Sequence, residues 1–165
     1  MVPMLAQNQK LNSFYAKYKH QPNTMAITLP GWLVKFGLSV SGEQAEMKKY
    51  KPLMRGFHSL RVLIMEEKNY ASPEEVKALV KHAKEHRFKD LVAIKEGKDR
   101  VNILLREKKT KKKEIIKNIM ILVSEEDELV LVTLNGRWKK SLLQKQLKEL
   151  MKEDGGHFMD SVVKL

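Results

Sequence analysis

The segment HAKEH, which holds His82 and His86, is the part of this sequence whose spacing most suggests metal chemistry. It matches the H-x-x-E-H pattern of one class of zinc peptidases, and two histidines four residues apart on a helix can share one zinc ion. The apolar residues around them, however, predict a buried stripe that leaves both imidazoles on its flank and Glu85 on the outer face. Nearby lysine and arginine side chains would also repel a cation. We interpret His82 and His86 as half-exposed surface residues; they are the only metal candidates, and we expect no cofactor.

A second candidate site is the basic segment REKKTKKKEIIKN, residues 106–118, in which seven residues are basic and two are acidic. Charge of this density attracts polyanions such as nucleic acid or anionic lipid. Strand-like segments flank the run on both sides, so we favour a simpler interpretation, the solvated turn of a hairpin. No aromatic residue that could stack on bases lies between Asp90 and Lys113, which argues against nucleic acid. The candidate polyanion-binding residues are Arg106, Lys108, Lys109, Lys111, Lys112, Lys113 and Lys117.

The remaining chemistry-bearing residues follow no catalytic pattern. No Gly-x-Ser-x-Gly elbow surrounds a serine, and the 8 glycines form neither a phosphate-binding loop nor a dinucleotide fingerprint. The chain has no cysteine, which excludes disulfides, thiolate metal sites and thiol nucleophiles. The chain has 32 Lys and Arg and 20 Asp and Glu, so its formal charge is +12. A positive charge of this size attracts polyanions but does not identify which kind. We therefore expect a protein that is not an enzyme.

Residues 1–9 are expected to lie outside the folded domain. MVPMLAQN lacks the basic start and the apolar stretch of a secretory signal, yet LAQ followed by a polar residue resembles the tail of one. These residues are therefore interpreted as a signal-peptide remnant or a disordered lead. No apolar run approaches the roughly eighteen residues of a spanning helix, so we expect no transmembrane segment.

The first half of the chain predicts helices alternating with two strands. Residues 8–20 place apolar side chains on one helical face, and the alternation over 24–30 predicts a strand that Pro30 ends. A helix is expected within 31–38, and a second one from Ser41 to about residue 54.

A buried strand is predicted over 57–67, and the clearest boundary in the sequence follows it. Ser72 as N-cap, Pro73 at the first helical position and Glu75 completing the capping box predict a helix over 72–86. The expected buried stripe of this helix is Val76, Leu79, Val80 and Ala83.

From residue 90 the hydrophobic period changes to that of extended chain. The four runs DLVAIKE, RVNILLRE, EIIKNIMILVSE and ELVLVTLNG predict a four-strand meander that Gly136 ends. The leucines after it predict a closing amphipathic helix, followed by a mobile tail over 153–165. We interpret 10–152 as a single α+β domain in two layers, a mainly antiparallel sheet with helices packed on one face. The methionines, among them Met47, Met54, Met65 and Met120, are expected to fill the core, and Trp32 and Trp138 to pack against helices.

The order of these segments resembles a bacterial domain family of unknown function, numbered forty-two fifty-two. The resemblance runs from about residue 10 to about residue 152 and is carried by FYAKYKHQPNTMAITLP, FHSLRVLIMEE, RVNILLREKK and EIIKNIMILVSEEDELVLVTLNG. It implies the fold and carries no catalytic residue. Members of the family resemble exported envelope proteins, some of them lipoproteins, so the resemblance implies export to the periplasm or cell envelope. This chain has no lipobox cysteine; if the sequence as given is the whole product, a cytoplasmic location is expected instead.

Three functions stay open at this point. The first is a non-enzymatic accessory or binding domain of the bacterial envelope, whose partner is another envelope protein or an anionic polymer. The second is polyanion binding, to nucleic acid or anionic lipid, through the basic hairpin loop at 106–117. The third is a metal-dependent enzyme that uses His82 and His86. We favour the first.

Overall fold

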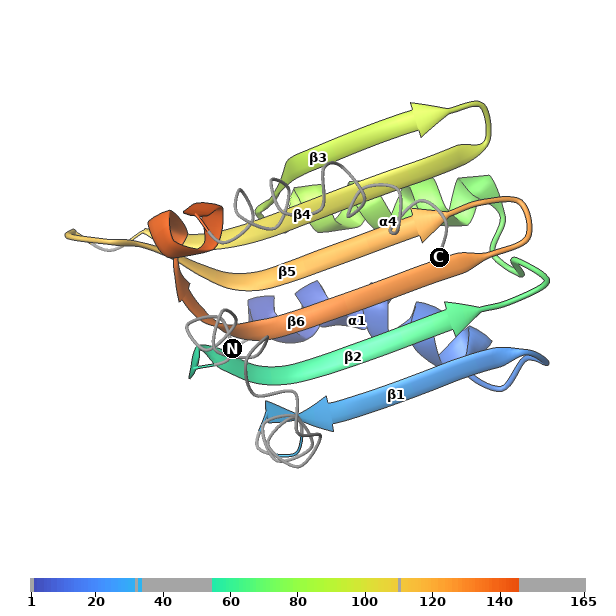
Figure 1. The fold of residues 1–165 in the computed structure, drawn as a ribbon, viewed down its shortest axis with the longest axis horizontal. Helices are drawn as coiled ribbons and strands as arrows, with labels where there is room; N and C mark the ends of the chain where they lie inside the picture. Colours follow the sequence, from blue (N-terminus) through green and yellow to red (C-terminus); the bar gives the residue numbers. More distant parts are fainter. Residues whose placement is uncertain (1, 32, 34–54, 110, 146–165) are drawn as a thin grey trace.

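Six antiparallel strands form one sheet in the computed structural model, which describes residues 2–31, 33, 55–109 and 111–145. The strand order is β1-β2-β6-β5-β4-β3, so the strands from β3 to β6 pair in chain order, while β2 pairs with the distant β6 (Figure 1). The strands are β1 (Thr24–Pro30), β2 (Phe57–Met65), β3 (Phe88–Glu96), β4 (Asp99–Lys109), β5 (Glu114–Ser124) and β6 (Leu129–Lys139).

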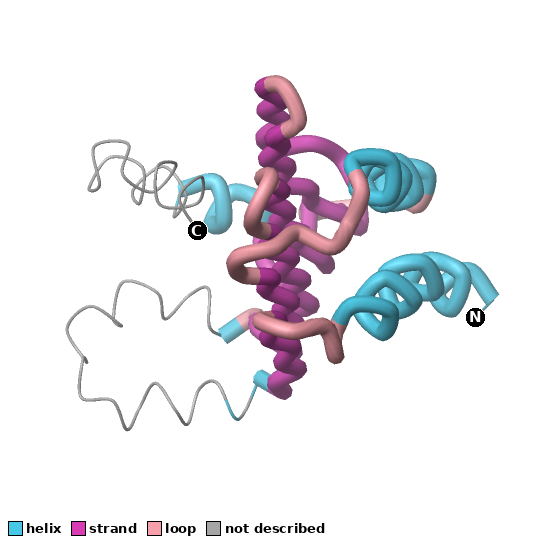
Figure 2. The backbone as a smooth tube through the Cα atoms, turned by 90° about the vertical axis from the view of Figure 1, so that its right-hand side faces the viewer, coloured by secondary structure: helices cyan, strands magenta, loops and turns pink. Residues whose placement is uncertain are grey.

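Two helices, α1 (Val2–Tyr18) and α4 (Pro73–Glu85), lie on the same face of this sheet (Figure 2). The start of α4 is fixed by its own sequence: the Ser72 hydroxyl accepts a hydrogen bond from the Glu75 backbone N–H at 3.1 Å, and Pro73 occupies the first turn. The helix from residue 72 is therefore confirmed, as is its buried stripe of Val76, Leu79, Val80 and Ala83.

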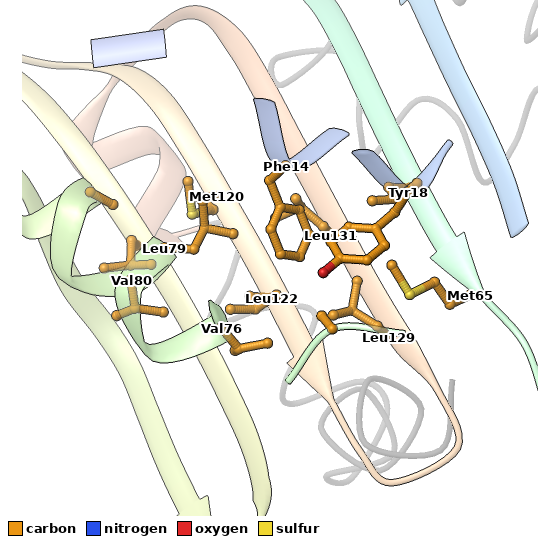
Figure 3. Packing of buried hydrophobic residues seen from close by; sticks show 14 residues of the cluster. Phe14, Tyr18, Met65, Val76, Leu79, Val80, Met120, Leu122, Leu129 and Leu131 are labelled. Atoms are coloured by element: carbon orange, nitrogen blue, oxygen red, sulfur yellow. The ribbon is translucent and has the colours of Figure 1, made fainter. Parts of the chain in front are cut away.

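The main core lies between these helices and the sheet (Figure 3). Phe14 and Tyr18 from α1 meet the α4 stripe and the buried residues that point to this face, Leu63, Met65, Leu104, Met120, Leu122, Leu129 and Leu131. The two helices are also tied together directly, because the Tyr18 hydroxyl donates to the Glu75 carboxylate and Lys17 Nζ lies 3.2 Å from it. Met65 and Met120 are core residues, as predicted.

The opposite face of the sheet carries a second apolar cluster. It contains Ile103, Leu105, Ile116, Ile119, Trp138 and Leu143, with Val101, Val123 and Val130 in a neighbouring group. Trp138 therefore packs against Leu143, in the helical segment that follows β6, and against strand side chains. Both faces of the central strands are apolar, which explains why their sequences are nearly continuous hydrophobic runs.

The predicted α+β class is confirmed, and the strand predicted over 24–30 coincides with β1. Two predicted boundaries were wrong. β6 continues through Gly136 to Lys139, and the helix predicted over 8–20 begins earlier, at Val2. The helices expected within 31–38 and 41–54, Met47, Met54, Trp32, most of the closing helix and the tail at 153–165 lie outside the described residues. In the described part, no helix is both long enough and apolar enough to cross a bilayer.

Candidate functional site

The exposed basic side chains of three separate segments lie at one end of the sheet. The β4–β5 turn, the beginning of β2 and the end of β6 meet there, at the left of Figure 1, because Ile116 is opposite Trp138 and Phe57 is opposite Gly136. We call this region the basic end. Its exposed basic residues are Arg55, Lys108, Lys111, Lys112, Lys113, Arg137, Lys139 and Lys145.

The other end of the sheet is rich in carboxylates. The β5–β6 turn, the β3–β4 turn and the segment after β2 contribute Glu66, Glu67, Glu96, Asp99, Glu125, Glu126, Asp127 and Glu128, with four basic residues among them. Burial first, and then the nearby Asp99 and Glu128 carboxylates, raise the pKa of Glu125. Among the described residues, exposed positive charge therefore gathers at one end of these strands and negative charge at the other.

An open depression of about 580 Å³ lies within the basic end. Its volume is in the range of sites that bind small ligands, about 300–1,000 Å³. Four cationic side chains, an indole, a hydroxyl and a leucine side chain line it, so positive groups that can pair with anionic oxygens stand beside apolar surface. The lining residues are Arg55, Gly56, Arg137, Trp138, Lys139, Ser141, Leu142 and Lys145.

Two glycines allow the wall of this depression to form. A Cβ on Gly136 would lie 2.3 Å from the Gly56 carbonyl oxygen and 2.6 Å from the indole carbon Cη2 of Trp138. A Cβ on Gly56 would lie 2.2 Å from the Arg137 carbonyl oxygen. Strands β2 and β6 therefore close around the indole, and the Arg137 backbone N–H donates to the Gly56 carbonyl at 2.7 Å. This packing holds the chain that carries Arg137 and Lys139 in one place.

The predicted basic segment forms a hairpin turn, as expected, but it is shorter than residues 106–117. Lys108 and Lys109 belong to β4, Lys117 belongs to β5, and only the residues around Lys111–Lys113 form the turn; the side chain of Lys109 lies outside the described part. The two acidic residues of the segment are engaged elsewhere: Lys140 Nζ lies 2.9 Å from Glu107 and 3.4 Å from Glu114. Lys111, Lys112 and Lys113 of the turn are exposed.

Arg106 was wrongly placed in the loop. It lies in β4 on the face covered by α1 and α4, and its Nε donates to Asn118 Oδ1 at 2.6 Å. Burial, and then the neighbouring Arg87, lower the pKa of Arg106. Asn118 in turn donates to Asn135 at 2.5 Å, and Asn135 donates to the Ser59 hydroxyl at 3.0 Å.

These four residues form a polar row across β4, β5, β6 and β2, and each is directly opposite the next. A bulge adjoins the row at each of the three strand pairs, so the row follows the bend of the sheet. A small cavity of about 30 Å³ lies beside it, lined by His82, Asn118 and Asn135 among others. That space admits one or two water molecules and is too small for an organic ligand. We interpret the row as structural.

The two candidate metal ligands lie side by side on α4. Their ring centroids are 4.2 Å apart, and His86 Nδ1 is 2.8 Å from the His82 carbonyl oxygen, so that nitrogen already has a protein partner. Burial first, and then the nearby His86 and Lys10, lower the pKa of His82. In the described residues, no group of three or more His, Asp or Glu side chains is placed to hold a metal ion.

The residues Arg55, Arg137, Lys139 and Lys145 were missed as site residues. The signal for two of them was present in the sequence: GRWKK at 136–140 puts basic residues on both sides of a tryptophan. What could not be read was that β6 continues past Gly136 and ends beside the β4–β5 turn.

Comparison with known families agrees with this architecture. A family model described as "Domain of unknown function (DUF4252)" matches residues 18–146, which include all six strands and α4. No curated protein matches the chain. Since the match covers well over half of its length, the chain belongs to the DUF4252 family.

Proposed function

We propose that this domain is a non-enzymatic binding module of the bacterial envelope and that its basic end binds an anionic polymer. The observation that carries the proposal is the convergence of three chain segments at one end of the sheet around the depression at Trp138. A single lysine-rich turn would be ordinary surface chemistry. Cations brought together by long-range strand pairing form a surface of defined shape.

The composition of the basic end favours a polymer of phosphate, sulfate or carboxylate groups over a nucleic acid. Single-strand binders stack bases on exposed aromatic rings, whereas Trp138 is only 4% exposed and its ring packs against Gly136. Arg55 and Arg137 supply planar guanidinium groups that can pair bidentately with anionic oxygens. The surrounding lysines supply positive point charges that attract an anion without fixing its orientation.

The envelope location rests on the family resemblance. It is tested by separating a producing bacterium into cytosol, periplasm and membranes and probing each fraction for the native protein. Recovery in the periplasm or with the membranes is expected. Recovery in the cytosol alone would contradict this part of the proposal and leave polymer binding to be judged separately.

The binding itself is tested by the salt dependence of affinity for polyphosphate and for a sulfated dextran. Each anionic contact that is lost removes roughly 0.7 to 0.9 from the slope of log affinity against log salt concentration. The triple variant Arg55→Gln, Arg137→Gln, Lys139→Gln should therefore lower the slope by about two to three. These side chains are exposed, so the change should leave the fold intact.

A matched control removes the same charge from elsewhere. Lys68, Lys77 and Lys98 are exposed and lie outside the basic end, and their replacement by glutamine should leave the slope nearly unchanged. A third variant, Lys108→Gln with Lys111→Gln and Lys112→Gln, separates the turn from the depression. Equal loss of slope in the first triple variant and the control would show that net charge alone drives binding and would refute the proposed site.

A further inference from the structure

Strand β3 forms one edge of the sheet and is exposed along nearly its whole length. It is the last strand in the sheet order, and β4 is its only strand neighbour in the described part of the chain. Leu91 and Ile94 on this strand are 41% and 43% exposed, which makes them two of the few large apolar side chains open to water. An open edge with exposed apolar side chains is a template for pairing with another strand.

The pairing of β3 with β4 shows where each β3 side chain points. Asp90 is opposite Leu104 and Val92 is opposite Ile103, so Leu91 is an extra residue in a bulge. The bulge shifts the alternation by one residue. Asp90, Ala93 and Lys95 therefore lie on the helix-covered face.

The strand sequence FKDLVAIKE is complementary to itself when a second copy is aligned antiparallel to it with Ala93 opposite Ala93 of the second copy. Val92 is then opposite Ile94, two apolar side chains on the same face. If the bulge residue Leu91 of each strand is left unpaired, the next pair outward is Asp90 opposite Lys95, on the helix-covered face.

One step further outward in the same alignment, Lys89 is opposite Glu96 on the other face. Two-fold symmetry repeats each of these matches. Opposite charges directly across an antiparallel pair are favourable, and like charges are unfavourable. Asp90 already forms an ion pair of 2.6 Å with Lys84 of α4, so the Lys89 and Glu96 pairs are the ones that select this register.

We propose that the protein forms a symmetric dimer through β3, so that two six-stranded sheets join into one continuous sheet. The other edge strand offers no such match, because β1, TMAITLP, carries no charge and ends in Pro30, which has no N–H to donate. Charges on an edge strand usually prevent association. On β3 the order of the charged residues instead favours pairing with a second copy of the same strand, in a single register. The basic ends are left free, so this dimer is independent of the proposed polymer binding.

A cysteine at position 93 tests the register directly. The chain contains no cysteine, so Ala93→Cys introduces a single thiol. Opposite residues in an antiparallel pair have Cβ atoms about 4.5–5.5 Å apart, close enough for a disulfide after small adjustment. Mild oxidation should therefore convert Ala93→Cys to a covalent dimer. The matched control Lys89→Cys, on the same exposed strand but far from the two-fold axis, should remain uncrosslinked.

Exchanging the charges of Lys89 and Glu96 provides a second test, which does not depend on a new thiol. In sedimentation velocity, Glu96→Lys or Lys89→Glu should weaken the dimer by about tenfold, because two symmetry-related pairs change from attraction to repulsion. The double variant Lys89→Glu with Glu96→Lys restores both pairs and should restore the dimer. Glu126→Lys, an exposed change in the β5–β6 turn, is the control. A monomer at all accessible concentrations, equal crosslinking of both cysteine variants, or no rescue by the double variant would overturn the proposal.

Discussion

Replacing Gly136 with alanine should destabilise the protein by an amount that follows from the packing around Trp138. The added Cβ would lie 2.3 Å from the Gly56 carbonyl oxygen, a backbone atom that cannot rotate away. Strands β2 and β6 must separate locally, which weakens the Arg137 N–H to Gly56 hydrogen bond of 2.7 Å. Overpacking costs about 1–3 kcal/mol and the weakened hydrogen bond about 1 kcal/mol, so the free energy of unfolding should fall by about 2–4 kcal/mol.

Thermal and urea denaturation followed by circular dichroism measure this change. For a domain of this size the expected loss corresponds to a melting temperature lower by roughly 5–15 °C. Gly97→Ala is the matched control: a Cβ there meets nothing within 4 Å, and only the positive φ of 62° is unfavourable, which costs about 1 kcal/mol. If Gly136→Ala is no more destabilising than Gly97→Ala, strands β2 and β6 do not close around the indole as described.

Three further changes test other parts of the structure. Tyr18→Phe removes the hydrogen bond to Glu75 that ties α1 to α4, and urea titration should show a loss of about 1 kcal/mol. Asn118→Leu removes the acceptor that pairs with Arg106 in β4; a loss of about 1.5–3 kcal/mol is expected, and no loss would show that the polar row is not structural. The folded-state pKa of His82 lies below its ordinary 6.5, so the unfolded chain binds the proton more tightly and stability should fall as the pH is lowered through the range just below 6.5. His82→Gln should flatten that dependence, measured as the urea midpoint against pH.

The sequence was sufficient where structure is decided locally. Ser72, Pro73 and Glu75 fixed the start of α4 because an N-cap hydroxyl and a first-turn proline act within one helical turn. The strand at 24–30 was likewise read from its alternation and its terminal proline.

The candidate site could not be read in the same way, because long-range strand pairing builds it. Residues 57–65 pair with residues 129–136, and only this pairing brings Arg55 next to Arg137. Gly136 was taken as the end of a strand because glycine usually marks a turn, whereas here its missing side chain lets two strands close around Trp138. Arg106 was taken as a loop residue because its neighbours in sequence are lysines, although β4 continues past it and regular alternation from the buried Leu104 places it on the helix-covered face.

Mapping where an anionic polymer contacts the protein would show whether the basic end is its binding site. Amide chemical shifts of the isotope-labelled full chain would be followed during titration with a short polyphosphate at physiological salt. If the polymer binds at the basic end, the largest changes should cluster at Gly56 and along Arg137 to Ser141, with smaller changes at Lys111–Lys113. Changes of equal size at the lysines of both ends of the sheet, or changes centred on the β3–β4 turn, would contradict it.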